Sequence, residues 1–259
     1  MRLFATFFFI LLCVSLQFAV PASASEDAKQ IMRHVYDRAN GNDRHYFITM
    51  TLINKNGGTR IRKMESFSKD YGKDRKSIMI FRDPADVSGT MFLSWEYDAI
   101  NRDDDKWLYM PAMKKVRRIS GASRNEYFMG SDYTYDDMGK RHPDKDTYTN
   151  LGSETVGGHS CWKIECTPVS DDLYTKRIVW VSKEALLVIK ADYFDKDGLI
   201  KAFLAKDFRK QDGFWSVYVG EMDNVSRNHK TIMTTEQIEY NTGIQDSIFT
   251  AATLQRGRI

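Results

Sequence analysis

The sequence predicts an α+β, mainly β protein built on a single curled antiparallel sheet, with an N-terminal helix and a helix-and-loop lid. Two observations predict this class. Apolar and polar residues alternate with a period of two over most of the 259-residue chain, which is typical of β-strands with two different faces. Turn signals separate these runs at spacings of roughly ten residues, as in an antiparallel meander. A sheet with so many strands does not stay flat, so we expect it to curl.

Residues 1–24 are interpreted as a secretory signal peptide and excluded from the fold. Arg2 precedes a long apolar run, and Ala22-Ser23-Ala24 forms an A-x-A cleavage site. An uncleaved anchor is the alternative, because roughly 17 to 25 apolar residues can span a bilayer. We expect an exported protein whose single domain is formed by residues 25–259.

The charge of the chain gives no reason to expect a nucleic-acid partner. The chain has 38 Lys and Arg residues against 35 Asp and Glu residues, and without Arg2 the balance is 37 against 35, a net of +2. Binding to nucleic acid requires a concentrated positive surplus. The basic residues here are local and balanced, so we expect no nucleic-acid partner.

The first predicted element after the signal peptide is a helix, AKQIMRHVYDRAN. Ser25 is positioned to cap it, and Gly41 supplies a stop. Ile31, Val35 and Ala39 form a single apolar face. We therefore expect the helix to lie on a larger apolar surface.

The runs that follow are predicted as strands, from their alternation and from the turns that bound them. The clearest hairpin crosses NKNGG, a strong turn signal. The predicted strands are 44–54, 59–68, 76–81, 90–97, 106–110, 115–119, 159–168, 176–182, 186–194, 199–208, 214–222 and 229–240. The C-terminal DSIFTAATLQRG is predicted as short coil or helix anchored by Phe249 and Leu254.

Residues 121–150 break the alternation. They have no clean period and are rich in aromatic residues, Gly and Asp. Irregular segments of this length inside a compact domain are usually functional or mobile. We predict that this segment is the lid.

Cys161 and Cys166 are predicted to be small buried hydrophobes. Five positions apart in one strand, they face opposite sides and lie roughly 17 Å apart along it. This separation exceeds the reach of a disulfide. No neighbouring pair of histidines suggests a metal site.

Catalytic signatures are mostly absent. The chain has no G-x-S-x-G elbow, no H-E-x-x-H and no P-loop. Asp132, Asp136 and Asp137 could ligate a divalent cation or act in acid–base chemistry, but they lack the alternating calcium-loop pattern. We favour the interpretation that Asp132 caps a short helical turn while the other two are solvated or paired. A metal-dependent or acid–base enzyme remains as a third alternative.

Three stretches together resemble one protein family. GTMFLSWEY (89–97), DKWLYMPAMKKVRRI (105–119) and EYFMGSDYTYDDM (126–138) are similar to the outer-membrane lipoprotein-sorting family, the LolA/LolB-like group, in its branch associated with RND-type exporters. The resemblance covers essentially residues 25–259. It implies an incomplete antiparallel barrel closed by helices, with an apolar concavity that carries acyl chains through the periplasm. It also implies no catalytic residue and no cofactor, so we expect no enzyme.

The cavity candidates combine alternation with the irregular segment. Strand alternation places the strand members on one face, and Phe128 and Met129 come from the segment. The predicted cavity residues are Met91, Leu93, Trp95, Trp107, Tyr109, Phe128 and Met129.

The stretch DDDKWLYMPAMKKVRRISG is predicted as a hairpin that turns near Ala112. One register opposes Trp107 to Arg117 and Tyr109 to Lys115, and a shifted one opposes Asp105 to Arg118. The free basic face is predicted to dock an envelope partner, through Lys114, Lys115, Arg117 and Arg118.

The predicted function is that of a monomeric periplasmic carrier. It would hold lipidated protein or lipid acyl chains and hand them over between envelope membranes, or to and from an RND-type transporter. The alternative is a periplasmic adaptor of such a transporter that carries nothing.

Overall fold

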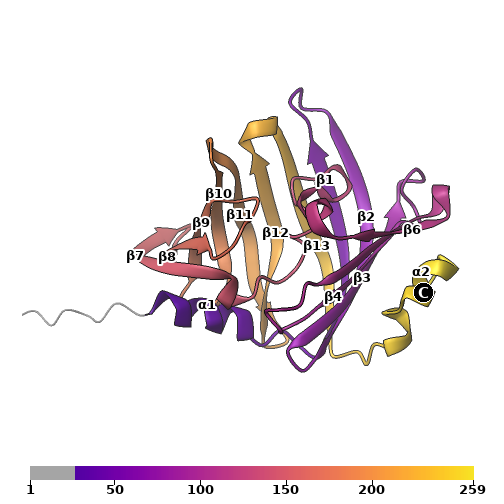
Figure 1. Cartoon of the computed structure of the whole chain (residues 1–259), viewed down its shortest axis with the longest axis horizontal. Helices are drawn as coiled ribbons and strands as arrows, with labels where there is room; N and C mark the ends of the chain where they lie inside the picture. Colours follow the sequence, from indigo (N-terminus) through magenta and orange to yellow (C-terminus); the bar gives the residue numbers. More distant parts are fainter. Residues whose placement is uncertain (1–26) are drawn as a thin grey trace, which may run out of the picture.

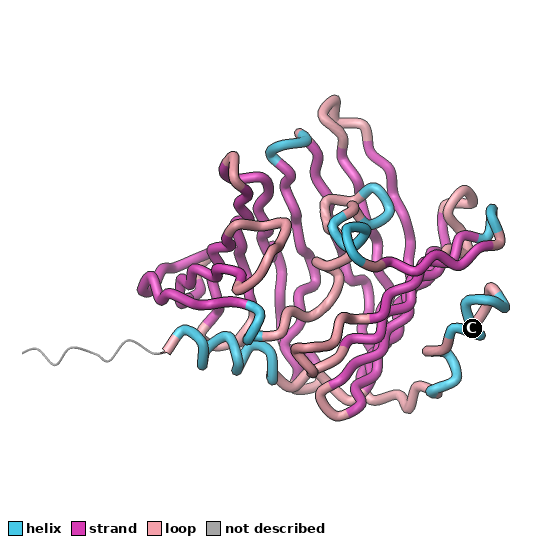
Figure 2. The backbone as a smooth tube through the Cα atoms, in the orientation of Figure 1, coloured by secondary structure: helices cyan, strands magenta, loops and turns pink. Residues whose placement is uncertain are grey.

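The computed structural model describes residues 27–259, so the predicted signal peptide and Ser25 lie outside the described residues. Within them, one 13-stranded antiparallel sheet curls around a concave side and stays open between its two edge strands (Figure 1). Figure 2 shows the small helical content against the long strands. The predicted fold class is confirmed.

The elements begin with helix α1, Ala28–Asp37, and end with helix α2, Ala251–Arg256. The strands between them are β1 Asp43–Ile53, β2 Thr59–Tyr71, β3 Asp74–Asp83, β4 Met91–Glu96, β5 Asp105–Met110, β6 Lys115–Ile119, β7 Asp146–Val156, β8 His159–Pro168, β9 Lys176–Ser182, β10 Val188–Asp195, β11 Gly198–Gln211, β12 Phe214–Asn224 and β13 His229–Tyr240. Short 3-10 turns occupy Pro111–Met113, Gly121–Asn125, Phe128–Gly130, Pro143–Lys145, Val225–Arg227 and Asp246–Ile248.

The strand order explains why the irregular segment lies where it does. The sheet runs β6-β5-β4-β3-β2-β1-β13-β12-β11-β10-β9-β8-β7, so the first and last strands pair at its centre. The two edges, β6 and β7, are therefore consecutive in the chain. Residues 120–145 connect them and must cross the open side of the sheet. We call residues 120–145 the crossing segment.

Strand β7 was not predicted. Its first five residues, 146–150, lie in the segment expected to be irregular, and no alternating pattern marks residues 151–156 as a strand. β7 is an edge strand that pairs with β8 alone, and most of its side chains are exposed, including Leu151 at 45%. An edge strand exposed on both faces has no apolar face, so it carries no alternating signal.

Helix α1 is shorter than predicted. It ends at Asp37, so Ala39 is outside it, and its N-cap is Asp27, whose carboxylate accepts from the Lys29 amide at 3.0 Å. Ala28 and Ile31 are buried against a cluster on the concave face of β8, β9 and β10. The predicted docking of this helix on a larger apolar surface is confirmed.

The C-terminal segment covers the outer face of the first half of the sheet. Phe249 and Leu254 are 1% and 0% exposed and pack on β3 and β4, as their predicted anchoring role requires. The indole Nε1 of Trp95 donates to the Phe249 carbonyl at 2.9 Å. Asp43 accepts the backbone amides of Thr242 and Gly243, which fixes the turn out of β13.

Cys161 and Cys166 are both free and buried. They belong to clusters on opposite faces of β8, Cys166 on the concave face with α1 and Cys161 on the outer face with Trp180. The prediction of two structural thiols is confirmed.

Candidate functional site

A cavity of about 340 Å³ lies on the concave side of the sheet, between α1, the crossing segment and strands β7 to β12. Cavities that hold small ligands span about 300 to 1,000 Å³, so this one is at the lower end of that range. Its apolar wall is formed by Met32, Val35, Tyr133, Tyr148, Cys166, Val179, Val188, Ala191, Tyr193, Phe203 and Met222. We call this the acyl cavity, because an acyl chain is the ligand that the family resemblance implies.

Helix α1 forms one wall of the acyl cavity and is fixed by apolar packing, by exposed ion pairs and by Tyr36, whose hydroxyl donates to Asp98 at 3.1 Å. Met32 and Val35 face the cavity and are half-buried, whereas Ala28 and Ile31 pack against the sheet. On its solvent side the helix is tied by ion pairs from Lys29 and Arg33 to Asp144, at 2.7 and 3.0 Å. These exposed pairs contribute little to stability, so the helix is held mainly by its apolar packing and by the contacts of Tyr36 with Asp98 and His142.

The polar end of the acyl cavity is an ion-paired network. Asp146, buried on β7, accepts two bonds of 2.7 Å from Arg141 and one of 2.5 Å from Arg177. Arg141 also binds Asp172 at 2.7 Å. Burial alone lowers the pKa of Arg141, but the bonds and charges of the two carboxylates outweigh it and raise that pKa.

The network leaves the acyl cavity without a spare charge. Two guanidinium groups face Asp146 and Asp172, and the further lining carboxylate, Asp137, is paired with Lys201 at 2.6 Å. Burial raises the pKa of the cavity thiol of Cys166 to about 12, so this thiol stays neutral. Burial likewise raises the pKa of Tyr193. The surroundings are therefore suited to an uncharged apolar ligand, and they offer no activated nucleophile.

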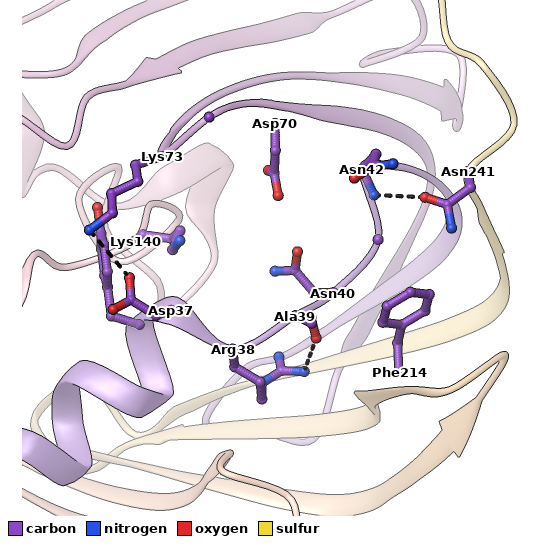
Figure 3. Close-up of a pocket in the computed structure, with 13 residues that line it drawn as sticks. Asp37, Arg38, Ala39, Asn40, Asn42, Asp70, Lys73, Lys140, Phe214 and Asn241 are labelled. Carbon is purple, nitrogen blue, oxygen red and sulfur yellow. Dashed lines mark hydrogen bonds and ion pairs between the residues drawn. The ribbon is translucent and has the colours of Figure 1, made fainter.

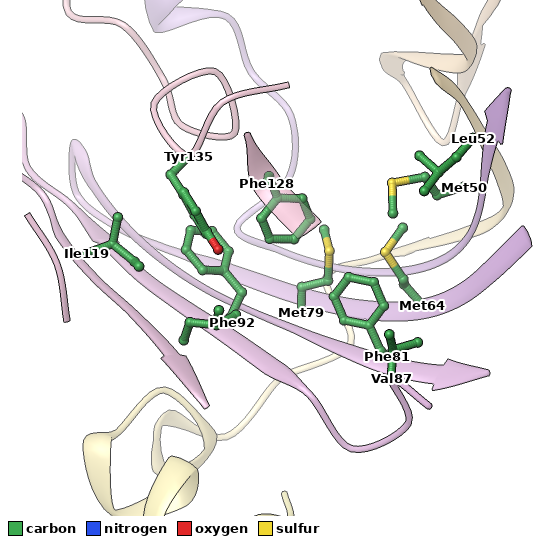
Figure 4. Packing of buried hydrophobic residues seen from close by; sticks show 11 residues of the cluster. Met50, Leu52, Met64, Met79, Phe81, Val87, Phe92, Ile119, Phe128 and Tyr135 are labelled. Carbon is green, nitrogen blue, oxygen red and sulfur yellow. The ribbon is translucent and has the colours of Figure 1, made fainter. Parts of the chain in front are cut away.

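The other half of the concave side is filled by the crossing segment. Phe128 is fully buried, with ring centroids 5.2 Å from Phe92, 5.5 Å from Tyr135 and 5.9 Å from Phe81 (Figure 4). Arg62 donates to the carbonyl of Met129. The segment predicted as a lid instead packs against the concave face of β1 to β5 and fills the space there. We call this part of the concave side the plugged half.

Three carboxylates anchor the crossing segment to the sheet, and of these Asp132 is fully buried whereas the Asp136 side chain is 42% exposed. Asp132 accepts from His229 at 2.6 Å and from Thr231 at 2.7 Å on β13. Asp137 pairs with Lys201 of β11 at 2.6 Å, and Asp136 with Lys106 of β5 at 3.0 Å. Each carboxylate is therefore bound to a different strand.

These contacts decide the roles of the three aspartates. Asp136 and Asp137, expected to be solvated or paired, are both paired, but Asp132 does not cap a helical turn. Its side chain binds His229 and Thr231 because the segment crosses the sheet at this point. Among residues 27–259 no group of three or more His, Cys, Asp or Glu side chains is placed to hold a metal ion.

The structure separates the seven predicted cavity residues. Phe128 and Met129 lie on the concave side, in the plugged half. The other five lie on the outer face, packed with Phe249 and Leu254 of the C-terminal segment: Met91, Leu93, Trp95, Trp107 and Tyr109. Figure 4 shows the C-terminal helix on the opposite side of the strands from Phe92 and Phe128. The prediction that these five residues share one face of the sheet is correct, but that face is the outer one and not the concave one.

This correction has a physical reason. Alternation identifies which residues share a face, but not which face is concave. Here both faces of β4 are buried, one under the crossing segment and one under the C-terminal segment. The acyl cavity was missed because its wall comes from many strands. The apolar face of the N-terminal helix was the signal that pointed to it.

The predicted docking residues lie at one edge of the sheet. Lys114 follows the turn Pro111–Met113 in the left-handed conformation, and β6 is exposed from Lys115 to Arg118. Arg117 pairs with Glu126, and Arg118 with Asp105 at 2.5 Å. Within residues 27–259, Lys114 and Lys115 have no ion-pair partner.

The register of this hairpin differs from both predicted registers. Trp107 opposes Arg118, Tyr109 opposes Val116 and Met110 opposes Lys115. The 3-10 turn at Pro111–Met113 with Lys114 after it moves the centre of the hairpin by half a residue from Ala112. Arg118 still reaches Asp105, diagonally across the strands.

Comparisons with known proteins agree with this fold. A family model described as an uncharacterized protein matches residues 73–256. No curated protein matches the chain. A crystal structure of a DUF1329 family protein from Desulfovibrio piger is 31% identical, with a TM-score of 0.84, over 88% of this chain and 100% of that one.

Two further solved structures share this fold. An outer membrane lipoprotein-sorting protein domain from Vibrio parahaemolyticus is 29% identical, with a TM-score of 0.82, over 88% of this chain and 98% of that one. A LolA superfamily protein from Nitrosomonas europaea is 16% identical, with a TM-score of 0.68, over 88% and 100% of the two chains, which shows a shared fold.

In the described part of the chain, no helix combines the length and the apolar character needed to cross a membrane. The resemblance to the LolA/LolB-like group is confirmed by the two closely superimposing folds. The matched family model and the relative that is 31% identical over its whole length show that the chain belongs to the DUF1329 family.

Proposed function

We propose that this protein is a periplasmic carrier that shelters an acyl chain, of a lipid or a lipidated protein, in the acyl cavity beneath α1. The observation that carries the proposal is the wall of that cavity, apolar along its length and closed by a charge-neutral network at Asp146. The likeness to a lipoprotein-sorting domain supports it.

The energetics favour a covered site and a handover. Removing one methylene from water is worth about 0.8 kcal/mol, so sheltering roughly 14 of them is worth on the order of 11 kcal/mol. Release into water would forfeit this sum, so cargo passes directly to an acceptor. A full acyl chain also requires the acyl cavity to widen. We infer that helix α1 is the wall that moves, because its ion pairs are exposed and the side chains that it turns to the cavity, Met32 and Val35, are only half-buried.

The test joins lipid extraction to a matched pair of variants. Protein purified from cells is extracted for mass spectrometry, and uptake of a fluorescent fatty acid is titrated. Val188→Phe places a ring in the acyl cavity. Leu187→Phe places the same ring one residue away, in the cluster on the outer face.

A carrier gives co-purified lipid, saturable uptake, a loss of uptake of about tenfold or more in Val188→Phe and normal uptake in Leu187→Phe. Two results would reject the proposal: wild-type protein that neither contains nor takes up lipid, or equal uptake by the two variants.

Handover requires a partner, and we place its docking site at the exposed edge strand β6. Lys114 and Lys115 are the exposed cations there without an ion pair in the described chain, and an RND-type envelope transporter is the proposed partner. Lys114→Glu with Lys115→Glu is expected to abolish cross-linking to the transporter while fatty-acid uptake remains. Lys55→Glu, on an exposed turn far along the sheet, is the control. If the Lys114→Glu, Lys115→Glu double variant still cross-links to the transporter, β6 is not the docking site.

The same experiments distinguish the carrier from the alternative function, an adaptor that carries nothing. It predicts that the charge reversal abolishes function in cells while Val188→Phe has no effect. The carrier predicts that both abolish it. We further propose that the protein acts as a periplasmic monomer, which cell fractionation and the mass of the purified protein by light scattering will test.

A further inference from the structure

A second pocket, of about 490 Å³, opens at the end of the sheet where α1 runs into β1 (Figure 3). It shares no lining residue with the acyl cavity. Its wall carries several charged and amide side chains and is formed by Tyr36, Asp37, Arg38, Ala39, Asn40, Gly41, Asn42, Asp70, Gly72, Lys73, Lys140, Phe214 and Asn241. We call this the basic pocket.

Two half-buried cations in the wall of the basic pocket have no carboxylate partner. Arg38 donates through Nη1 to the Trp215 carbonyl at 2.7 Å and to the Ala39 carbonyl at 3.4 Å. The Lys140 ammonium lies 4.1 Å from the ring centroid of Tyr36. In the described chain neither cation has a carboxylate oxygen within 4.0 Å.

More positive charge lies directly behind these two residues. Arg44 and Arg75 both bind the same carboxylate, Asp70, at 2.9 and 3.0 Å. Nη2 of Arg75 and Nε of Arg38 are buried without a hydrogen-bond partner in the described chain. One carboxylate is therefore shared by two guanidinium groups, and no charge is left for Arg38.

The balance of charge around the basic pocket is positive. Three cations line it, Arg38, Lys73 and Lys140, and two more, Arg44 and Arg75, bind the lining residue Asp70 from behind. Asp37, which pairs with Lys73 at 3.9 Å, and Asp70 oppose them, and Glu96 adds a third carboxylate behind Lys140 when it is ionised. Asp98, which accepts a hydrogen bond from Tyr36 at 3.1 Å, is a fourth carboxylate beside the pocket, so five cations against four carboxylates leave a surplus of +1.

Burial makes this surplus unfavourable in the free protein. Burial, with the charge of Arg75 as a smaller cause, lowers the pKa of Lys140 to about 8. Burial also lowers the pKa of Arg38. A cation removed from water without a counter-charge costs free energy, and an anion that enters the pocket restores the missing interaction.

We infer that the basic pocket is a binding site for a phosphate group, held by the Lys140 ammonium and the Arg38 guanidinium. The side-chain amide of Asn40 points toward the same opening in Figure 3 and supplies a further donor. A guanidinium and an ammonium together form short, charge-assisted bonds to the oxygens of a phosphate. The inference goes beyond the acyl-carrier function and does not depend on it.

The shape of the basic pocket favours a phosphate carried by a larger molecule. A volume of about 490 Å³ exceeds what one phosphate fills. At Gly72, which has a φ of +70°, no atom lies within 4 Å of where a Cβ would stand, so that side is open. The phosphate could belong to a lipid headgroup or be free in solution, and the experiment separates these sources.

The test measures anion binding by calorimetry and by the shift in melting temperature, at constant ionic strength. The probes are inorganic phosphate, glycerol 3-phosphate and vesicles of phosphatidylglycerol, with chloride and phosphatidylcholine vesicles as references. Lys140→Met removes an unpaired cation and keeps an apolar stem against Tyr36, so the fold is retained. Lys55→Met is the matched surface control.

We expect phosphate probes to raise the melting temperature of the wild-type protein above that in chloride. Lys140→Met is expected to weaken binding about tenfold or more, and Lys55→Met to leave it unchanged. Tighter binding of glycerol 3-phosphate, with Lys140-dependent binding to phosphatidylglycerol vesicles, identifies a lipid headgroup. Binding of inorganic phosphate alone identifies free phosphate.

Two outcomes overturn the inference: phosphate probes that act no differently from chloride, or Lys140→Met protein that binds them as well as wild type. Val188→Phe protein keeps its phosphate binding in either case, because the acyl cavity shares no lining residue with the basic pocket. The failure of one proposal is thus distinguishable from the failure of the other.

Discussion

The two halves of the concave side are built from one sheet and are completed in opposite ways. Over β1 to β5, the crossing segment inserts Phe128 among Phe81, Phe92 and Tyr135, and the space is filled. Over β7 to β12, the cover is α1, whose half-buried Met32 and Val35 leave a cavity of about 340 Å³. A filled half supplies stability, and an unfilled half supplies room for a ligand.

The largest expected effect comes from emptying the filled half. Phe128→Ala removes a fully buried ring, and we expect it to lower the free energy of unfolding by about 3 to 5 kcal/mol. Met32→Ala, on the half-buried wall of the acyl cavity, is expected to cost about 1 kcal/mol or less. Urea denaturation measures both. Equal losses would show that the two halves do not differ as described.

The next effect tests how the crossing segment is held. Lys201→Met leaves the buried Asp137 carboxylate without its cation, and we expect a loss of about 3 kcal/mol. Adding Asp137→Leu removes the unpaired charge and should restore most of the loss. Chemical denaturation of the single and double variants gives the comparison. If the double variant is no more stable than Lys201→Met, the unpaired Asp137 carboxylate is not the cause of the loss.

A smaller effect compares added bulk in the two halves. Val87→Phe overfills the plugged half, where Val87 is 8% exposed, and we expect a cost of about 1 to 3 kcal/mol. Val188→Phe extends into the acyl cavity and is expected to cost less than about 1 kcal/mol. Thermal unfolding of the ligand-free proteins measures the difference. The reverse order would contradict the assignment of the unfilled half.

The smallest expected effect is a pH-dependent change in the free energy of unfolding. It comes from Lys140, near the end of the crossing segment. Its pKa is lowered in the folded state, from 10.5 to about 8, mainly by burial. Below pH 8 the ammonium is charged in both states and its burial opposes folding. Between pH 8 and 10.5 the folded state loses this proton first, so the cost declines. The groups that face it are Tyr36, Arg44, Asp70, Arg75 and Glu96.

Lys140→Met should therefore stabilise the protein at pH 7 by roughly 1 kcal/mol after allowance for solvent screening. This gain should shrink as the pH rises from 8 to 10.5. Denaturation of the wild type and the variant at a series of pH values isolates the contribution of this one group. A gain that is constant over this range would place the pKa of Lys140 at its ordinary value.

Much of the fold followed from local pattern. Alternation predicted twelve of the thirteen strands, which the structure confirms, and five-residue spacing placed Cys161 and Cys166 on opposite faces. The missed strand, β7, is exposed along most of its length and carries no apolar face to detect. The hairpin register predicted about Ala112 was wrong by one position. The register depends on the conformation of Lys114 in the turn and not on the pairing of side chains.

The candidate site followed from the sequence only in part. The sequence by itself determined which residues share a face of each strand, that Met91, Leu93 and Trp95 point the same way, and that residues 121–150 differ from the rest. Only the tertiary structure decided which face is concave. That choice depends on β1 pairing with β13 and on Phe249 and Leu254 covering the outer face. Both are contacts between residues far apart in the chain, and no local periodicity encodes them.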